Sequence, residues 1–174
     1  MISQKVRDKL IEQVKTEWES DFFYLAMMAW CFNNDYDGFG NWFYNQANEE
    51  RGHGLRILQY VTDVGGDISV PSVDVPRIAF EGLEHIFKLQ LEHEELVTKR
   101  VYELVNLSVQ ENDHSTHTFL QWFIKEQIEE ESTARNLLAK VRRAEGSPGA
   151  LLMLESELAK QRPAKLPGTE EADG

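Results

Sequence analysis

The chain has 174 residues, of which 41% are hydrophobic, and its formal net charge is −12. This length suits a single domain with a hydrophobic core, whereas the acidic balance argues against nucleic-acid binding and favours cations. The single cysteine, Cys31, excludes an intrachain disulfide and a cluster of cysteine ligands. No apolar run approaches the roughly 20 residues of a membrane span, and no leader precedes the first amphipathic segment, so we expect a soluble, cytoplasmic protein.

Helical periodicity predicts four long helices and a short fifth one. We expect the first helix to begin after an N-cap at Ser3 and to end at Asn33, where an Asn-Asp-Tyr-Asp-Gly turn follows. The second is expected to end near Val64, because two glycines follow it. The third spans about 79–110 and the fourth about 115–143. Ser147 and Pro148 indicate the start of the fifth, which carries leucines up to residue 158.

The links between these helices differ in length. The stretch 67–77 contains Pro71 and Pro76 and is expected to be an extended crossover, whereas two of the other links are short turns. One long and two short links fit an all-α four-helix bundle with a long crossover between the second and third helices. We expect the bundle and the fifth helix to form one domain over residues 1–161, and residues 162–174 to form a disordered tail.

Each long helix carries one glutamate in a row of bulky residues that are spaced seven apart. Because seven residues return a helical side chain to nearly the same face, these glutamates are expected to point into the bundle core. An ionised carboxylate in such a core is costly unless a cation compensates its charge, so the pattern predicts an internal metal site. The four rows are Leu10–Glu17–Tyr24, Phe43–Glu50–Ile57, Phe87–Glu94–Val101 and Phe123–Glu130–Leu137.

The second helix adds a histidine to this set. Glu50 and His53 are three residues apart, so both face the same way and can hold one ion. The spacing alone is common, and a solvated glutamate beside a histidine at the core rim is the alternative interpretation. Together with the other glutamates, the pattern matches di-iron carboxylate bundles, and the oxygen-rich ligands suit Fe(II). We expect one ion on Glu17, Glu50 and His53. A second ion is expected on Glu94 and Glu130, with Glu50 bridging both.

Two further polar residues extend the predicted site. Gln127 stands where a second Glu-x-x-His motif would have its glutamate, and we expect it to orient a ligand or dioxygen by hydrogen bonds. Tyr24 lies seven residues from Glu17, so its hydroxyl is a candidate to bond a site carboxylate or to donate an electron. The alternative for Tyr24 is a core tyrosine with a satisfied hydroxyl.

The residues of this predicted site resemble those of a prokaryotic non-haem ferritin. The likeness covers nearly the whole chain, including the crossover and the fifth helix. It implies a hollow homo-oligomeric shell of twenty-four subunits, in which the ferroxidase centre of each subunit oxidises Fe(II) with O2 or H2O2. The Fe(III) is then stored inside as a hydrated oxide mineral. The matching positions are Glu17, Tyr24, Glu49, Glu50, His53, Glu94, Gln127 and Glu130, with the segment 119–131 around the last two.

The same resemblance implies a third iron position beside the main pair. Three of its acids share one side of the fourth helix, which makes such a site physically reasonable. The alternative is a solvated acidic patch, although crowded like charges are destabilising without a cation. The acids concerned are Glu49, Glu126, Glu129 and Glu130.

Two departures from related families bear on the cofactor and on the iron route. Haem-carrying bacterioferritins have a methionine directly after the glutamate of the first Glu-x-x-His motif. This chain has Arg51 there, so no haem is expected. Animal-type ferritins line their threefold pore with acids, whereas the corresponding stretch here offers His117 and Leu120, which leaves the iron entry route undecided.

Four other functions are alternatives. An inactive storage shell conflicts with the complete set of ligands, and a haem-type bacterioferritin conflicts with Arg51. A rubrerythrin-like peroxidase needs a cysteine-rich iron module and a second Glu-x-x-His motif, which the chain lacks. The small twelve-subunit starvation-type ferritins lack a C-terminal helix of the kind expected at 148–158.

Overall fold

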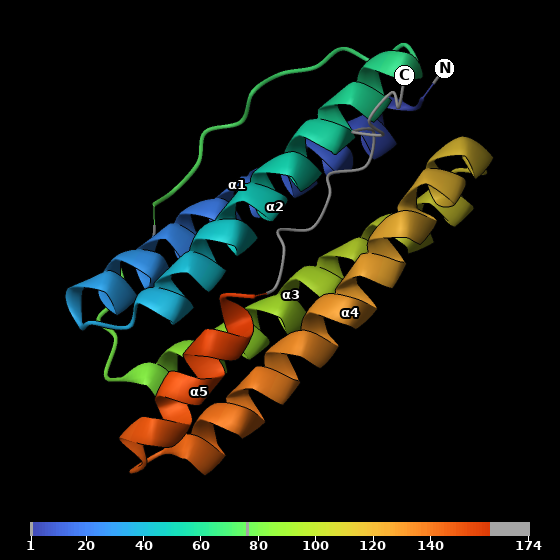
Figure 1. Ribbon diagram of the computed structural model, residues 1–174. Coiled ribbons are helices and arrows are strands. Elements are labelled where there is room, and N and C mark those ends of the chain that lie inside the picture. Colours follow the sequence, from blue (N-terminus) through green and yellow to red (C-terminus); the bar gives the residue numbers. More distant parts are fainter. Residues whose placement is uncertain (1, 76, 161–174) are drawn as a thin grey trace, which may run out of the picture.

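The computed structural model describes residues 2–75 and 77–160, and this part of the chain contains helices and no strands (Figure 1). None of these helices combines the length and the apolar composition that crossing a membrane requires. The expected C-terminal tail lies outside the described residues. The helices are α1 (Gln4–Asn33), α2 (Asp37–Asp63), α3 (Leu83–Gln110), α4 (His114–Ala144) and α5 (Pro148–Leu158).

The long helices form two antiparallel pairs that lie side by side. Figure 1 shows α1 beside α2 and α3 beside α4, with the link from α2 to α3 running along the length of the bundle. Short turns join the helices within each pair, and side-chain caps begin α1 and α4: Ser3 accepts from Val6 N, and Asp113 accepts from Thr116 N. The predicted all-α bundle with its crossover is therefore confirmed.

The start of α3 differs from the prediction by four residues. We expected a helix from Ala79, but the segment before Leu83 is extended. Ile78 and Phe80 are partly buried against the core, and their spacing of two is the period of an extended chain. The apolar residues at 78–83 therefore resemble a helix face in sequence, while they reach the core from the end of the crossover.

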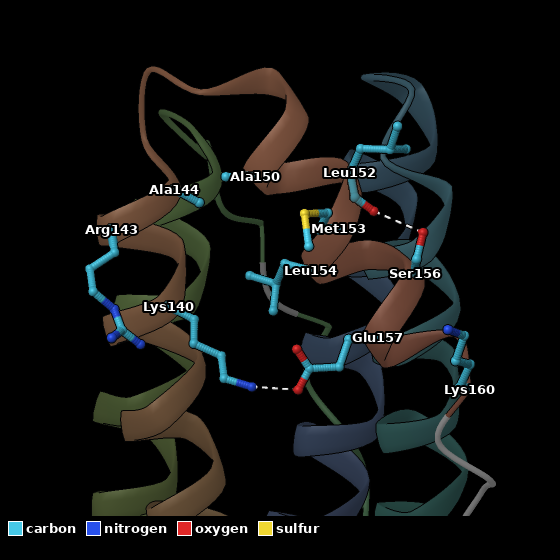
Figure 2. Close-up of a pocket in the computed structure, with 10 residues that line it drawn as sticks. All are labelled: Lys140, Arg143, Ala144, Ala150, Leu152, Met153, Leu154, Ser156, Glu157 and Lys160. Carbon is cyan, nitrogen blue, oxygen red and sulfur yellow. Dashed lines mark hydrogen bonds and ion pairs between the residues drawn. The ribbon is translucent and has the colours of Figure 1, made fainter.

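The short helix α5 closes one end of the bundle. Its residues Leu154 and Leu158 are buried, and Glu155 Oε1 accepts from Gly38 N at the start of α2. On the other side, Lys140 of α4 donates to Glu157 at 2.6 Å (Figure 2). A cavity of about 710 Å³ lies between α4 and α5, and its lining includes the exposed residue Met153. α5 thus connects the start of α2 with the last turns of α4.

The apolar core is divided into two clusters by a polar layer. One cluster is aromatic and includes Phe39, Phe43 and Phe87. The other is largely aliphatic and includes Leu10 and Val101. On each long helix, the predicted metal-binding glutamate stands in the sequence between residues of the two clusters. The packing on both sides therefore holds these carboxyl groups in place while excluding water from them.

A glycine permits close packing of α1 and α2 beside this layer. Gly54 follows His53, and a Cβ atom at Gly54 would lie 2.3 Å from Trp18 Nε1. The same indole nitrogen donates to the carbonyl of Arg51 at 3.4 Å. A glycine inside a helix costs about 1 kcal/mol relative to alanine. Here that cost is offset because the indole ring occupies the space of the missing side chain.

We predict that Gly54→Ala lowers the midpoint of thermal unfolding. The added methyl group overlaps the Trp18 ring, and such overpacking typically costs about 1–3 kcal/mol, which outweighs the gain in helix propensity. The matched control is Gly149→Ala, because a Cβ atom at Gly149 meets no atom within 4 Å. That variant is expected to be neutral or slightly stabilising. Equal unfolding midpoints for both variants would contradict the packing role of Gly54.

Candidate metal centre

The bundle core contains the polar side chains that the heptad rows place on its inner face. Glu94 is completely inaccessible to solvent, and Glu130, the most exposed of the set, retains 8% of its accessible surface. They come from all four long helices, although these residues are far apart in the sequence. The buried set is Glu17, Glu50, His53, Glu94, Gln127 and Glu130, and Tyr24 is buried beside it.

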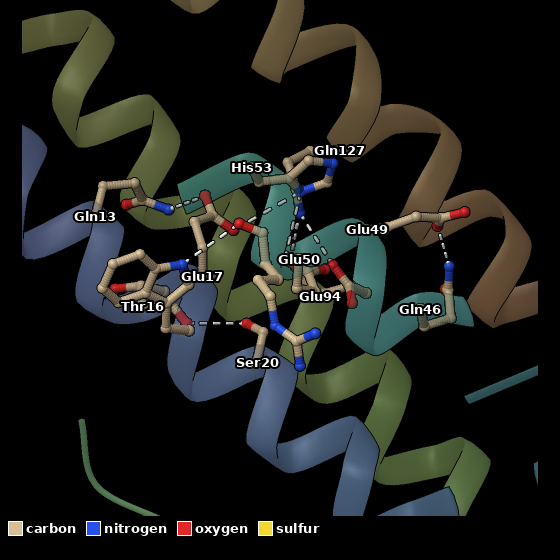
Figure 3. A network of polar contacts seen from close by, with 12 residues as sticks. Gln13, Thr16, Glu17, Ser20, Gln46, Glu49, Glu50, His53, Glu94 and Gln127 are labelled. Carbon is tan, nitrogen blue, oxygen red and sulfur yellow. Dashed lines mark hydrogen bonds and ion pairs between the residues drawn. The ribbon is translucent and has the colours of Figure 1, made fainter. Parts of the chain in front are cut away.

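One group of three has the geometry of a metal site. Ligand atoms of Glu17, Glu50 and His53 all lie within 4.8 Å of one another. His53 Nδ1 is 3.4 Å from Glu50 Oε2 and 3.9 Å from Glu17 Oε2 (Figure 3). Within residues 2–75 and 77–160, no other group of at least three acids, histidines or cysteines meets this criterion. Two carboxylate oxygens and one imidazole nitrogen are suitable ligands for a divalent first-row metal.

Two oxygens of this group lack hydrogen-bond donors. Glu17 Oε2 and Glu50 Oε2 are fully buried, and no donor in the described part of the chain bonds to either of them. The other oxygen of Glu17 accepts from Gln13 Nε2 at 2.9 Å. Buried polar atoms are nearly always satisfied, so unpaired oxygens that face a histidine indicate a binding position for a cation.

Glu94 is held by hydrogen bonds on both of its oxygens. The Tyr24 hydroxyl donates to Glu94 Oε1, and Gln127 Nε2 donates to Glu94 Oε2 at 3.2 Å. The same amide nitrogen lies 3.3 Å from Thr98 Oγ1. Tyr24 therefore bonds a carboxyl group of the predicted site, and Gln127 orients that carboxyl group from the opposite helix. Such outer contacts fix the geometry of a ligand and tune its basicity.

The acids of the predicted third iron position lie on α2 and α4 beside this core. Glu49 and Glu126 are half-buried and Glu129 is exposed, so this region is open to solvent on one side. Gln46 Nε2 donates to Glu49 Oε2 at 2.5 Å. Burial raises the pKa of Glu126, and the charges of Glu129 and Glu49 raise it further. The four acids thus affect one another electrostatically, but their oxygens do not converge as closely as those of the Glu17 group.

Burial dominates the protonation of the inner carboxyl groups. It raises the pKa of Glu17, Glu50 and Glu130 well above the usual range, and neighbouring carboxylates raise the pKa of each further. The pKa of Glu94 is raised to about 7, because the hydrogen bonds from Tyr24 and Gln127 stabilise its charged form and partly offset burial. Burial therefore favours the protonated form of these groups in the metal-free protein, and a bound cation would favour the charged form.

The structure adds polar residues that the heptad rows did not reveal. Gln13 precedes Glu17 by one turn, and its spacing of four is the only sequence signal for their hydrogen bond. Ser20 Oγ lies 2.7 Å from His93 Nε2 at the α1–α3 contact. Burial lowers the pKa of His93 to about 4, so this imidazole is neutral. The Ser20–His93 contact joins two helices, and a pattern within one helix does not report it.

The structure places two residues at which this sequence differs from haem-carrying bacterioferritins or animal-type ferritins. Arg51 Nε and Nη2 donate to the two carboxylate oxygens of Asp21 at 2.9 and 3.1 Å, so its side chain is directed toward α1 of the same subunit. Leu120 is 1% exposed and belongs to the aliphatic cluster of the core. Leu120 lies in the inward row of α4, which places its side chain inside the bundle, and the iron entry route stays undecided.

Comparisons with known proteins agree with this geometry. Residues 7–144 match the ferritin-like domain family. The bacterial non-heme ferritin of Staphylococcus aureus (strain USA300) is 37% identical over 158 residues, which cover 91% of this chain and 95% of that protein. The corresponding protein of Staphylococcus epidermidis is 36% identical over 159 residues, covering 91% and 96% of the two chains.

Solved structures of archaeal ferritins have the same fold. The open-pore ferritin of Archaeoglobus fulgidus is 34% identical and superimposes with a TM-score of 0.90, covering 93% of this chain and all of that one. A closed form of that ferritin, engineered by mutagenesis, gives a TM-score of 0.91 at 34% identity and covers 94% of this chain and all of its own. With four-helix architecture, buried glutamates and relatives of nearly equal length in agreement, the chain belongs to the ferritin family, among the prokaryotic non-haem ferritins.

Proposed function

We propose that this iron-storage protein is a ferroxidase. It oxidises Fe(II) at a di-iron centre inside each subunit and stores the product as a hydrated ferric oxide in a shell of twenty-four subunits. The observation that carries this proposal is the buried group of Glu17, Glu50 and His53, in which two carboxylate oxygens face a histidine without a hydrogen-bond donor. A group of this kind is unstable as a set of bare charges and is satisfied by a divalent cation.

The proposed ligands divide into two positions that share one residue. The first Fe(II) binds Glu17, Glu50 and His53, whose ligand atoms already lie close together. The second binds Glu94 and Glu130, and Glu50 bridges the two ions. Glu130 is the glutamate whose pKa is raised by both Glu94 and Glu50, which is consistent with its place beside them. Four carboxylates and one imidazole suit Fe(II), which accepts both oxygen and nitrogen ligands.

The reaction requires electrons and protons to balance. Each of two Fe(II) ions loses one electron, and O2 takes up these two electrons and two protons to form H2O2. With H2O2 as the oxidant, the O–O bond breaks and two waters form from the same numbers of electrons and protons. Tyr24 and Gln127 hold Glu94 in position during this change through hydrogen bonds to its two oxygens.

The acids beside the centre are proposed to form the third iron position. Glu130 belongs to both the inner pair and this outer group, so it links the buried centre to the partly exposed acids of α2 and α4. Their mutual effect on pKa shows that they repel one another as charged groups, and a cation relieves this repulsion. The proposed ligands are Glu49, Glu126, Glu129 and Glu130.

No haem is proposed for this protein. The residue directly after Glu50 is Arg51, whose Nε and Nη2 donate to Asp21 and whose Nη1 donates to Asn48, all within the subunit. Arginine is not a haem ligand of the axial type that histidine, methionine or cysteine supply. The chain's iron is therefore substrate and stored product.

Stopped-flow absorbance after aerobic mixing of Fe(II) with the apoprotein tests the proposal, together with light scattering for the shell size. The parent should show a rapid rise that saturates near two or three irons per chain.

Glu50→Ala removes the bridge and should slow this phase by about 100-fold or more, since even residues that support metal ligands are typically worth 10–100-fold. The matched control is Glu95→Ala, which removes an exposed glutamate of α3. If the parent is no faster than iron alone, the protein is an inactive storage shell. Equal initial rates in the parent and Glu50→Ala would refute the bridging assignment.

We predict that Glu130→Ala reduces the number of Fe(II) ions bound per chain, because Glu130 contributes to the second and third positions. Anaerobic titration calorimetry measures this number without oxidation. Glu131→Ala is the matched control, since the neighbouring Glu131 carboxylate pairs with Arg135 on the helix surface at 3.3 Å. Unchanged stoichiometry in Glu130→Ala would exclude Glu130 from both positions.

We predict that Fe(II) binding becomes weaker as the pH falls below neutrality. The pKa of Glu94 is about 7 in the metal-free protein, so this group is protonated below that pH, and Fe(II) must displace the proton. Above pH 7 the Glu94 carboxylate is already charged and binding is no longer opposed at this residue. A pH-stat should therefore record more protons released per bound Fe(II) at about pH 6 than at about pH 8. Equal release at both values would show that Glu94 does not change protonation on binding.

A further inference from the structure

A cavity of about 450 Å³ lies on the surface between α1 and α3, beside the metal centre. Its walls include Gln13 and Thr16 from α1, and Leu96 and Arg100 from α3. The acids Glu49, Glu126 and Glu129 lie on other helices and do not line it. The metal centre therefore has two different sides, one acidic and one with this cavity.

A single side chain connects the cavity with the innermost ligands. Gln13 is part of the cavity wall, is only 3% exposed, and donates through Nε2 to Glu17 Oε1 at 2.9 Å. Figure 3 shows Gln13 and Thr16 on the same helix as Glu17, with the Gln13 amide directed toward the Glu17 carboxyl group. Glu17 itself does not line the cavity. The Gln13 amide thus stands between the cavity and a proposed iron ligand.

The charges around the cavity do not favour a cation. Four of its lining residues are basic and three are acidic, and the acids Glu12, Glu19 and Glu103 each lie within 4.0 Å of a lysine nitrogen. One of these basic residues, Arg100, donates through Nη1 to Thr16 Oγ1 at 2.5 Å, which holds its positive charge on this wall. Fe(II) is repelled by such a surface, whereas a small neutral molecule that forms hydrogen bonds is accommodated.

We propose that this cavity admits hydrogen peroxide to the ferroxidase centre, and that the peroxide passes the Gln13 side chain, which separates the cavity from Glu17. The proposal rests on the proposed ferroxidase function and assigns the oxidant and the iron to opposite sides of the centre. Two Fe(II) ions each give one electron to H2O2, the O–O bond breaks, and two protons from solvent complete two water molecules. Gln13 does not react. It positions Glu17 and limits the size of the oxidant.

A matched pair of variants separates these two roles of Gln13. Gln13→Ala and Gln13→Leu both remove the hydrogen bond to Glu17, but only Gln13→Ala opens the wall. Anaerobic Fe(II)-loaded protein is mixed with H2O2 or with the bulkier tert-butyl hydroperoxide, which is reduced to the alcohol and water by the same two electrons and two protons. The ratio of the rate constant with the bulky peroxide to that with H2O2 should rise severalfold in Gln13→Ala and stay at the parent value in Gln13→Leu.

Narrowing the cavity at its mouth gives an independent test that leaves Gln13 intact. Leu96 is 45% exposed on the cavity wall, and Leu96→Trp fills part of the opening. Val109→Trp is the control, because Val109 is an exposed residue of the same helix outside the cavity. Leu96→Trp should lower the second-order rate constant with H2O2 severalfold and leave the anaerobic Fe(II) stoichiometry unchanged, and Val109→Trp should change neither.

The outcomes are distinguishable. An unchanged peroxide ratio in Gln13→Ala, or an unchanged rate in Leu96→Trp, overturns the route through the α1–α3 cavity while leaving the ferroxidase proposal in place. A loss of Fe(II) stoichiometry in Leu96→Trp also overturns it, because the cavity would then serve iron. If the parent protein fails to oxidise Fe(II) with either peroxide or O2, the proposed function itself fails.

Discussion

Four carboxyl groups are buried in the core of this bundle, and their lost hydration and mutual repulsion constrain the rest of the structure. Each must either hold a proton or face a cation, because an isolated charge in such surroundings is too costly. The pKa values of Glu17, Glu50 and Glu130 are accordingly raised well above their usual range. The apolar clusters on either side supply the packing that retains these groups, so the same core that stabilises the fold also positions the residues that could hold a metal ion.

Many of the buried polar residues of the bundle belong to α1. Five of its buried residues are polar, and most of them contact α2 or α3 and not the apolar clusters. Glu17 is oriented by Gln13 of the same helix, while Asp21 binds Arg51 from α2. This arrangement leaves the α1–α3 contact polar and mixed in charge, and it leaves the acids of α2 and α4 on another side. Two chemically different surfaces beside the centre are the basis of the proposed separate entry of a cation and a neutral oxidant.

Local patterns predicted most of the helices because caps, turns and apolar periodicity act within one segment. Ser3 and Asp113 begin helices through hydrogen bonds to residues three positions away, and Pro148 stands at the first turn of α5, where its fixed φ suits a helix. The start of α3 was misplaced because Ile78 and Phe80, at the end of the crossover, are apolar through their packing against the core and not through membership of a helix face. The burial of Leu120 is likewise decided by the neighbouring helices.

The sequence by itself determined the all-α class, the crossover and the inward direction of the four glutamates, since a period of seven is a property of one helix. It also supplied the Glu50–His53 spacing. Only the tertiary structure decided that Glu17 meets this pair, that Tyr24 and Gln127 both hold Glu94, and that Gln13 borders a cavity. The physical reason is that distances between helices depend on how whole faces pack, which no spacing along a single helix records.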